Sequence, residues 1–227
     1  ELYSMARKRG FEPPFILGFI LTSYFIFLSI YDYYNIKYDK DIFLIFIIII
    51  AILYFITQMF KKDHIMLLPN ISISIFGSVY LGYLFSFILK IKYLPNGNYC
   101  LLSLLFITWV NDSAAYIIGT KFGKNRIFPQ ISPKKSIEGS IGGIIFSTIS
   151  VFILKNWLSL TFTKLIFLCL VIAIMAQFGD LFESMLKRGS EVKDSGNLFP
   201  GHGGILDCLD SLLFTAPVFY YYITFLI

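Results

Sequence analysis

The chain has 227 residues, of which 57% are hydrophobic and only 15% are charged, and its mean hydropathy is +0.74. A soluble globular domain carries about 25% charged residues, so these values exclude a soluble domain, and they also exclude disorder, collagen and a coiled coil. The three cysteines form no C-x-x-C pair, which argues against a disulfide framework and a zinc ribbon. The composition therefore predicts an all-α, polytopic transmembrane helical bundle.

Seven apolar runs are candidate transmembrane helices, because about 20 apolar residues rising about 1.5 Å each span the hydrocarbon core. The β-branched isoleucines of the second run favour a strand in water. In lipid an open strand leaves backbone groups unpaired, so a helix is predicted. Pro217 makes the last run the least regular. The runs cover approximately residues 15–31, 42–60, 71–89, 99–118, 137–154, 160–178 and 211–227.

The basic residues predict how these spans are oriented. With the N-terminus in the cytoplasm, thirteen of the nineteen lysines and arginines fall in cytoplasmic segments, which follows the positive-inside rule. The two longest polar loops, 119–136 and 179–210, then face the cytoplasm. Because the chain begins at Glu1 shortly before its first apolar run, we expect a trimmed N-terminus. Basic groups beside anionic lipid explain the net charge of +5, and we expect no nucleic-acid partner.

Acidic residues mark the second half of the chain as the functional half. An ionisable group inside an apolar span is expensive and usually functional. Asp112 lies in one such span, and Asp180 and Glu183 share a helical face at the end of another. Asp207 and Asp210 are three residues apart and can share a hard cation such as Mg²⁺, which prefers one or two carboxylates plus substrate phosphates.

Cations and glycines accompany these acids in the segment SMLKRGSEVKDSGNLFPGHGG, residues 184–204. Glycines let backbone N–H groups approach a ligand, and cations neutralise phosphate charge. The segment therefore predicts a site for phosphoryl or nucleotidyl transfer. A solvated connector is the alternative, although Gly-His-Gly-Gly beside carboxylates argues against it. Neither a P-loop nor an H-E-x-x-H motif is present.

The first polar loop ends in a second group of cations, the segment SPKKS at 132–136. Ser136 suits the N-cap of a helix that begins near Ile137, and a helix N-terminus beside lysines can bind an anion. Lysines that simply face lipid head groups are the alternative. Gly139 and Gly143 form a G-x-x-x-G pattern, which predicts close helix packing.

Two blocks of these residues resemble the phosphatidate cytidylyltransferase family, also called CDP-diacylglycerol synthases. The blocks span most of 109–211, while the N-terminal half shares only its hydrophobic character. The upstream block matches at Asp112, Ala115, Tyr116, Gly119, Phe122, Gly123, Lys124, Ser132, Pro133, Lys134, Lys135, Ser136, Glu138 and Gly139. The downstream block matches at Ser184, Lys187, Arg188, Lys193, Asp194, Pro200, His202, Gly203, Gly204, Asp207 and Asp210.

The resemblance implies an enzyme that transfers the cytidylyl group of CTP to phosphatidate, giving CDP-diacylglycerol and pyrophosphate for phospholipid synthesis, with Mg²⁺ as cofactor. It suggests a homodimer in a bacterial-type inner or cell membrane. We divide the chain into N-terminal transmembrane helices, 1–98, and a catalytic transmembrane region, 99–227, that carries both polar loops.

The same interpretation gives each candidate residue a role. Catalysis is assigned to Lys187, Arg188, Lys193, Asp194 and His202. Substrate binding is assigned to Ser132, Lys134, Lys135, Ser184, Gly203 and Gly204. Metal binding is assigned to Asp180 and Asp207, with Asp210 and Asp112 as weaker candidates.

One residue departs from the family pattern, and it leaves alternatives open. Cys208 stands where the family has an arginine, which would add a fixed charge near phosphate or hold a carboxylate. An inactive relative is therefore one alternative. A CTP-dependent polyprenol or phytol kinase is another, and a transporter with buried carboxylates is a third.

Overall fold

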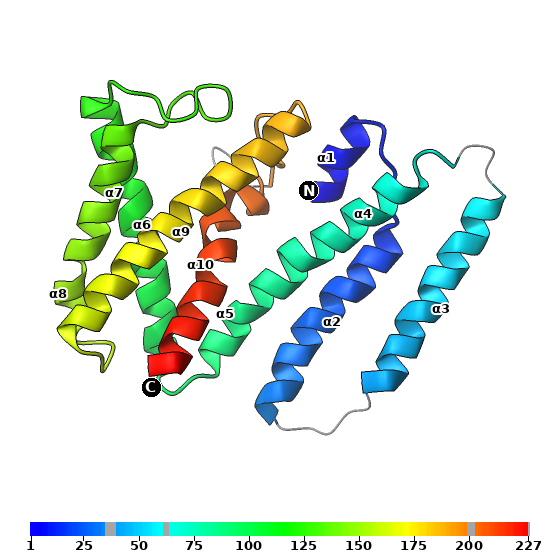
Figure 1. Cartoon of the computed structure of the whole chain (residues 1–227), viewed down its shortest axis with the longest axis horizontal. Helices are drawn as coiled ribbons and strands as arrows, with labels where there is room; N and C mark the ends of the chain where they lie inside the picture. Colours follow the sequence, from blue (N-terminus) through cyan, green and yellow to red (C-terminus); the bar gives the residue numbers. More distant parts are fainter. Residues whose placement is uncertain (35–39, 61–63, 199–202, 227) are drawn as a thin grey trace. The chain divides into compact units, whose positions relative to one another are not determined.

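The computed structural model describes residues 1–34, 40–60, 64–198 and 203–226, and this part of the chain is helical (Figure 1). Each of the seven apolar runs is mainly helical over its described residues, as predicted. The elements are α1 Leu2–Lys8, α2 Phe15–Tyr34, α3 Lys40–Met59, α4 Leu67–Gly77, the π-helix η1 Ser78–Tyr83, α5 Leu84–Lys92, α6 Gly97–Phe122, α7 Ile137–Ile149, α8 Val151–Leu154, α9 Phe162–Gly189 and α10 Ile205–Leu226.

Five of the helical segments are long and apolar enough to cross a membrane, and the chain is a polytopic membrane protein. They are Leu67–Lys92, Gly97–Phe122, Ile137–Leu154, Phe162–Gly189 and Ile205–Phe225. The described parts of α2 and α3 add two shorter apolar helices, Phe15–Tyr31 and Ile47–Met59. Pro217 lies inside α10 without ending it.

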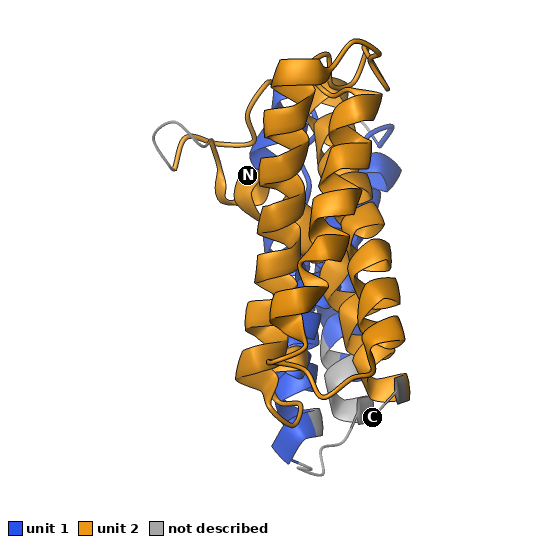
Figure 2. Ribbon diagram, turned by 90° about the vertical axis from the view of Figure 1, so that its left-hand side faces the viewer, with its two compact units in different colours: residues 1–90 blue, residues 91–227 orange. Residues whose placement is uncertain are grey.

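The chain divides into two compact units, residues 1–90 and residues 91–227, which Figure 2 colours separately. In the first unit, α2 packs on η1 at a very close approach, because a Cβ on Gly82 would lie 2.8 Å from the Cα of Thr22. The Ser78 hydroxyl donates to the Gly18 carbonyl across the same contact, at 3.0 Å. Small residues therefore let these two helices meet at the backbone, as in other membrane bundles.

The second unit is built on a close contact between α6 and α7. A Cβ on Gly139 would lie 2.7 Å from the Ala115 carbonyl oxygen, and one on Gly143 would lie 2.9 Å from the Asn111 carbonyl oxygen. The predicted packing role of Gly139 and Gly143 is thus confirmed. The Ser147 hydroxyl adds an interhelical hydrogen bond to the Ile107 carbonyl, at 3.3 Å.

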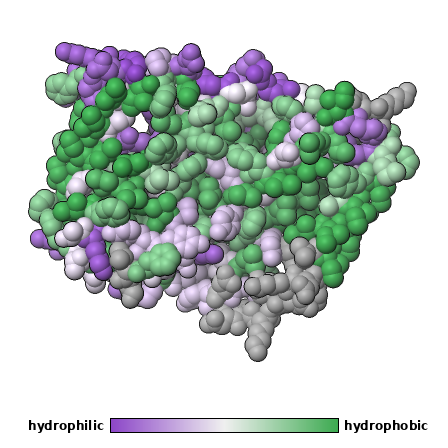
Figure 3. All heavy atoms as spheres, viewed as in Figure 1, coloured by the Kyte–Doolittle hydropathy of each residue, from purple (hydrophilic) through white to green (hydrophobic). Residues whose placement is uncertain are grey.

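Helix α9 packs against α6, α7 and α10 and forms the centre of this unit. Its contact with α10 is also made at a glycine, since a Cβ on Gly179 would lie 2.6 Å from the Asp210 carbonyl oxygen. Ile172 on α9 and Phe219 on α10 are fully buried. Seen as spheres, the upper edge of this unit, over the α6–α7 loop and the end of α9, is hydrophilic, while its flank is hydrophobic (Figure 3).

The second polar loop is shorter than the sequence suggests. Helix α9 continues to Gly189 and α10 begins at Ile205, so the loop covers 190–204 rather than 179–210. No proline interrupts α9, and Lys187 and Arg188 favour its last turn through the helix dipole. Asp180 and Asp207 therefore lie on helices and are held by them.

We predict that Gly139→Ala destabilises the protein. The added methyl group would overlap the Ala115 carbonyl, which is backbone and cannot rotate away, and overpacking of this kind costs about 1–3 kcal/mol. Gly189→Ala is the matched control, because a Cβ there meets nothing within 4 Å. Thermal unfolding in detergent should show a lower Tm for Gly139→Ala alone, and equal Tm values for both variants would contradict the packing role.

Candidate active site

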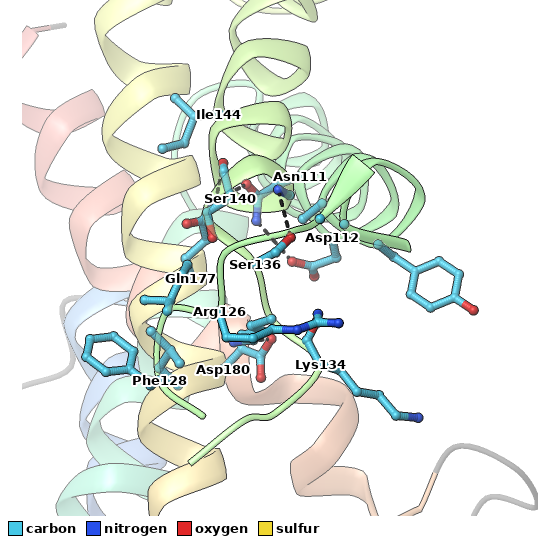
Figure 4. Close-up of a pocket in the computed structure, with 18 of the residues that line it drawn as sticks. Asn111, Asp112, Arg126, Phe128, Lys134, Ser136, Ser140, Ile144, Gln177 and Asp180 are labelled. Atoms are coloured by element: carbon cyan, nitrogen blue, oxygen red, sulfur yellow. Dashed lines mark hydrogen bonds and ion pairs between the residues drawn. The ribbon is translucent and has the colours of Figure 1, made fainter. Parts of the chain in front are cut away.

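A cavity of about 790 Å³ lies between α6, α7 and α9 under the loop that follows α6 (Figure 4). Its volume falls in the range of about 300–1,000 Å³ that is typical of ligand pockets. One part of its wall is apolar and includes Ile144, Ile174 and Phe178. The other part is polar and includes Asp112, Lys135 and Asp180. The cavity thus suits a ligand with an apolar part and an anionic part.

The loop over the cavity, 123–136, has a defined fold. Ser136 caps α7 as predicted, since its hydroxyl accepts from the Gly139 N–H at 3.1 Å. An antiparallel bridge joins Arg126 to Ser136, and the Ile127 N–H donates to the Lys135 carbonyl at 3.3 Å. The two ends of the loop are therefore paired with each other, and this pairing fixes the backbone position of Lys135.

Glu138 holds the start of the same loop from the first turn of α7. Its carboxylate accepts from the Asn125 side-chain amide at 2.8 Å, from the Asn125 N–H at 3.2 Å and from the Lys124 N–H at 3.1 Å. In the family resemblance Glu138 is only a matching residue, whereas these hydrogen bonds give it a structural role. Because the loop cannot open without breaking these bonds, Glu138 keeps the roof of the cavity in place.

The two adjacent lysines of this loop have different surroundings. The Lys135 ammonium pairs with the Asp180 carboxylate on α9 at 2.6 Å, and both side chains are partly exposed. Lys134 is exposed, and its carbonyl accepts from the Arg126 guanidinium at 2.7 Å. Lys135 is therefore the lysine that the structure brings to the acids.

Two side-chain amides, the buried Asn111 and the half-buried Gln177, lie beside these charges. The Asn111 side-chain amide donates to Asp112 Oδ1 at 3.0 Å. The Gln177 amide donates to Asn111 Oδ1 at 3.2 Å and to the Ser140 carbonyl at 2.9 Å. Asp112 in turn lies within electrostatic reach of Asp180 and Lys135.

A second ion cluster joins α9 to α10. The Lys187 ammonium lies 2.5 Å from Glu183 Oε2 and 2.6 Å from Asp207 Oδ1, and the Glu183 side chain is fully buried. Asp207 Oδ2 also accepts from the Ser195 N–H, the Ser195 hydroxyl and the Gly204 N–H, at 2.7–2.9 Å. Asp207 thus holds the loop 190–204 at Ser195 in its interior and at Gly204, its last residue.

The predicted metal ligands are only partly suited to Mg²⁺ in this arrangement. Asp210 lies within electrostatic reach of Asp180 and Asp112. These three carboxylates come from three helices, and carboxylate oxygens are the donors that Mg²⁺ prefers. Both oxygens of Asp207 already have partners. In the described part of the chain, no three acidic, histidine or cysteine side chains converge closely enough to ligate one ion.

The other predicted residues lie around this centre. Arg188 donates to the Ile131 carbonyl at 3.2 Å and to the Val192 carbonyl at 3.4 Å, so it links the two polar loops. The Ser184 hydroxyl lies 3.4 Å from Asp180 Oδ1. Gly203 adopts a φ of 90°, which few L side chains tolerate, and a Cβ there would lie 2.5 Å from Asp207 Oδ2.

The remaining assignments add no contact to the centre. Lys193 and Asp194 are exposed on the loop, and Ser132 is half-buried in its own turn, where its N–H donates to the Phe128 carbonyl. His202 lies outside the described residues, together with Pro200.

Sequence reasoning missed three residues that the site uses: Asn111, Gln177 and Ser195. Asn111 precedes the acid that was noticed, and Gln177 stands in an otherwise apolar run. An amide in an apolar run needs hydrogen-bond partners, so both residues were detectable as polar exceptions. Ser195 carries no such signal, because a serine in a polar loop is unremarkable.

Fold and site together define a polytopic membrane protein whose spans enclose a cavity with an anionic and cationic end. A model of the cytidylyltransferase family matches residues 1–226, and the chain belongs to this family. The family resemblance expected from the sequence is therefore confirmed.

Named relatives agree with this assignment. The chain is 32% identical over 224 residues to a phosphatidate cytidylyltransferase of Bacillus subtilis, which covers 97% of this chain and 82% of that protein. It is 42% identical over 166 residues to a phosphatidate cytidylyltransferase of Thermotoga maritima, covering 70% of this chain and 61% of that protein. A Haemophilus influenzae phosphatidate cytidylyltransferase is 41% identical over 138 residues, covering 58% and 48%. The last two matches span less than two thirds of the relatives' length.

We predict that Glu138→Ala loosens the loop over the cavity. The N–H groups of Lys124 and Asn125 would lose their carboxylate acceptor, so hydrogen–deuterium exchange at these amides should accelerate. Glu138→Gln keeps one acceptor oxygen and should give an intermediate rate. The amides of 190–198 serve as the internal control. Equal acceleration of exchange in both loops would contradict a local role of Glu138.

Proposed function

We propose that this chain transfers the cytidylyl group of CTP to phosphatidate. A phosphate oxygen of the lipid attacks the α-phosphorus of CTP, the bond from that phosphorus to the bridging oxygen of the β-phosphate breaks, and pyrophosphate leaves. The observation that carries the proposal is the cavity, which joins an apolar wall inside the spans to the Lys135–Asp180 pair at its polar end. The names of the curated relatives support the same reaction.

The residues of the cavity meet the main physical difficulty of this reaction, which is that two anionic reactants repel each other. Lys135 offers an ammonium group that Asp180 already orients, and Arg126 and Lys134 lie near by on the same loop. Holding both phosphates against such fixed cations lowers the repulsion and aligns the attack. The apolar wall formed by Ile144 and Phe178 suits the glycerol and acyl part of the lipid.

Mg²⁺ is the cofactor we propose. Because the described carboxylates do not converge as a three-ligand site, one or two of Asp112, Asp180 and Asp210 would hold the ion together with substrate phosphates. Bound there, the ion would neutralise charge on the triphosphate and polarise the reacting phosphate. The carboxylates of this set supply the hard oxygen donors that the ion prefers. Asp207 stays a predicted ligand, although Lys187, Ser195 and Gly204 occupy its carboxylate in this structure.

The polar loops are proposed to face the cytoplasm of a bacterial-type cell membrane, where CTP is made. Support comes from the excess of lysine and arginine on the segments of that side. The homodimer remains a prediction from the resemblance. Cross-linking in native membranes tests it.

The reaction can be tested with CTP labelled at its α-phosphorus. Purified protein, phosphatidate and Mg²⁺ should move the label into lipid and release unlabelled pyrophosphate. A CTP-dependent lipid kinase would leave the label in CDP, and a transporter would leave CTP intact, so either result contradicts the proposal.

Lys135→Met should lower this activity by about a hundredfold or more, because the oriented cation that faces the phosphates is lost. Lys121→Gln is the control, since this exposed lysine in the last turn of α6 lies outside the cavity lining and also removes one positive charge. Initial rates at saturating CTP give the comparison. Equal losses in both variants would show that net charge, and not the position of Lys135, matters.

Chelation of divalent ions should abolish label transfer, and added Mg²⁺ should restore it. Asp180→Asn should raise the Mg²⁺ concentration required for half-maximal activity, because one oxygen ligand loses its charge. Glu12→Gln, far from the acids in sequence and in the first unit, is the control for a general loss of negative charge. Activity that persists in excess chelator would contradict the metal proposal.

A further inference from the structure

A chain of hydrogen bonds crosses the polar end of the cavity and connects three helices. It runs from the Ser140 carbonyl on α7 to Gln177 on α9, then to Asn111 and Asp112 on α6, with lengths of 2.9, 3.2 and 3.0 Å. Figure 4 shows Ser140, Gln177 and Asn111 pointing toward one another, with Asp112 beside Asn111. We call these three side-chain links the amide relay.

The relay has a fixed direction. A backbone carbonyl only accepts, so Gln177 must turn its NH₂ group toward Ser140. The second hydrogen of that NH₂ group then meets Asn111 Oδ1, which forces the NH₂ group of Asn111 toward Asp112. The orientation of both amides is thus set by a carbonyl that belongs to a helix backbone and cannot turn.

The Asn111 side chain is also closely packed. Asn111 is 1% exposed, and a Cβ on Gly143 would lie 2.7 Å from its Oδ1. A buried amide in an apolar span costs stability unless its groups are paired, so an apolar side chain would be the simpler filler. Packing alone therefore does not account for an amide at this position.

The relay acts on one oxygen of one carboxylate. Asp112 Oδ1 accepts from Asn111, while Oδ2 has no hydrogen-bond partner among the described residues. Asp112 lines the cavity and lies within electrostatic reach of Lys135 and Asp180. Fixing Oδ1 thereby fixes the direction in which Oδ2 is presented to the cavity.

We propose that Asn111 and Gln177 are positioning residues that hold the Asp112 carboxylate in its reactive orientation. This inference rests on the proposed cytidylyl transfer, for which Asp112 is a predicted metal ligand. Neither amide touches the reacting phosphates; both act through Asp112. Their loss should therefore affect turnover more than substrate affinity, because a misplaced group of this kind costs about ten- to a hundredfold in rate.

The test uses Gln177→Met, which keeps the length of the side chain and removes both donated hydrogen bonds. Thr108→Val is the matched control, since it removes a buried hydroxyl one turn before Asn111 whose bonds stay within α6. We expect kcat to fall about tenfold or more in Gln177→Met with KM for CTP changed less than about threefold, and both values to stay near wild type in Thr108→Val.

A double-variant cycle separates positioning from a structural role. If Gln177 acts through Asp112, Gln177→Met should reduce kcat no further in an Asp112→Asn background. If the kcat losses of the two substitutions multiply in the double variant, or if Gln177→Met has a normal kcat, the relay is overturned. Label transfer by the wild type would still uphold the proposed function.

An infrared measurement decides the relay without catalysis. The carboxylate band that disappears in Asp112→Asn should shift in Gln177→Met and stay in place in Thr108→Val, because the hydrogen bond to Oδ1 changes only in the first. An unshifted band in Gln177→Met overturns the relay. Failure of the wild type to transfer label would instead contradict the proposed function. The position of the carboxylate band would still test the relay in that case.

Discussion

The close approach of α6 and α7 is the constraint on which the rest of the site depends. Gly139 and Gly143 let the two backbones meet, and any side chain there would collide with main-chain oxygens of α6. With α7 held so near, Ser140 can reach Gln177, and the loop from Phe122 to Ile137 has to return over the cavity. A packing feature that lies outside the chemistry thus sets the distances within it, because backbones in contact cannot slide as flexible side chains can.

Charge pairing gives the second level of organisation. An unpaired charged side chain within a membrane span costs free energy. In this bundle, acidic side chains are paired with lysines from other elements. Lys135 joins the first loop to α9 through Asp180, and Lys187 joins α9 to α10 through Asp207. The two pairs differ in use. The first lies partly exposed at the cavity, where a substrate phosphate can reach it, whereas the second is nearly buried and secures the helix ends.

Much of this arrangement is visible in the sequence, and the rest is lost for identifiable reasons. The length and polarity of each run predict the spans. Ser136 predicts the N-cap of α7, and Gly139 predicts a close helix contact. The end of α9 is misjudged because lysine and arginine suit a helix terminus as well as a loop. The split between Lys134 and Lys135 is invisible, since two adjacent lysines look alike until a bridge fixes the loop. Gln177 and Asn111 are 66 residues apart, and their contact exists only once three helices pack.

The same reasoning bears on Cys208, where the family pattern has an arginine. An arginine could hold a carboxylate or add charge near phosphate, so its absence raises the question of what replaces it. Cys208 is exposed in the first turn of α10, while the carboxylate of its neighbour Asp207 is already held by Lys187, Ser195 and Gly204. Holding that carboxylate therefore does not require an arginine. Without this arginine, other groups have to neutralise the phosphate charge. Lys135, on the loop 123–136 beside Asp180, is placed for that role.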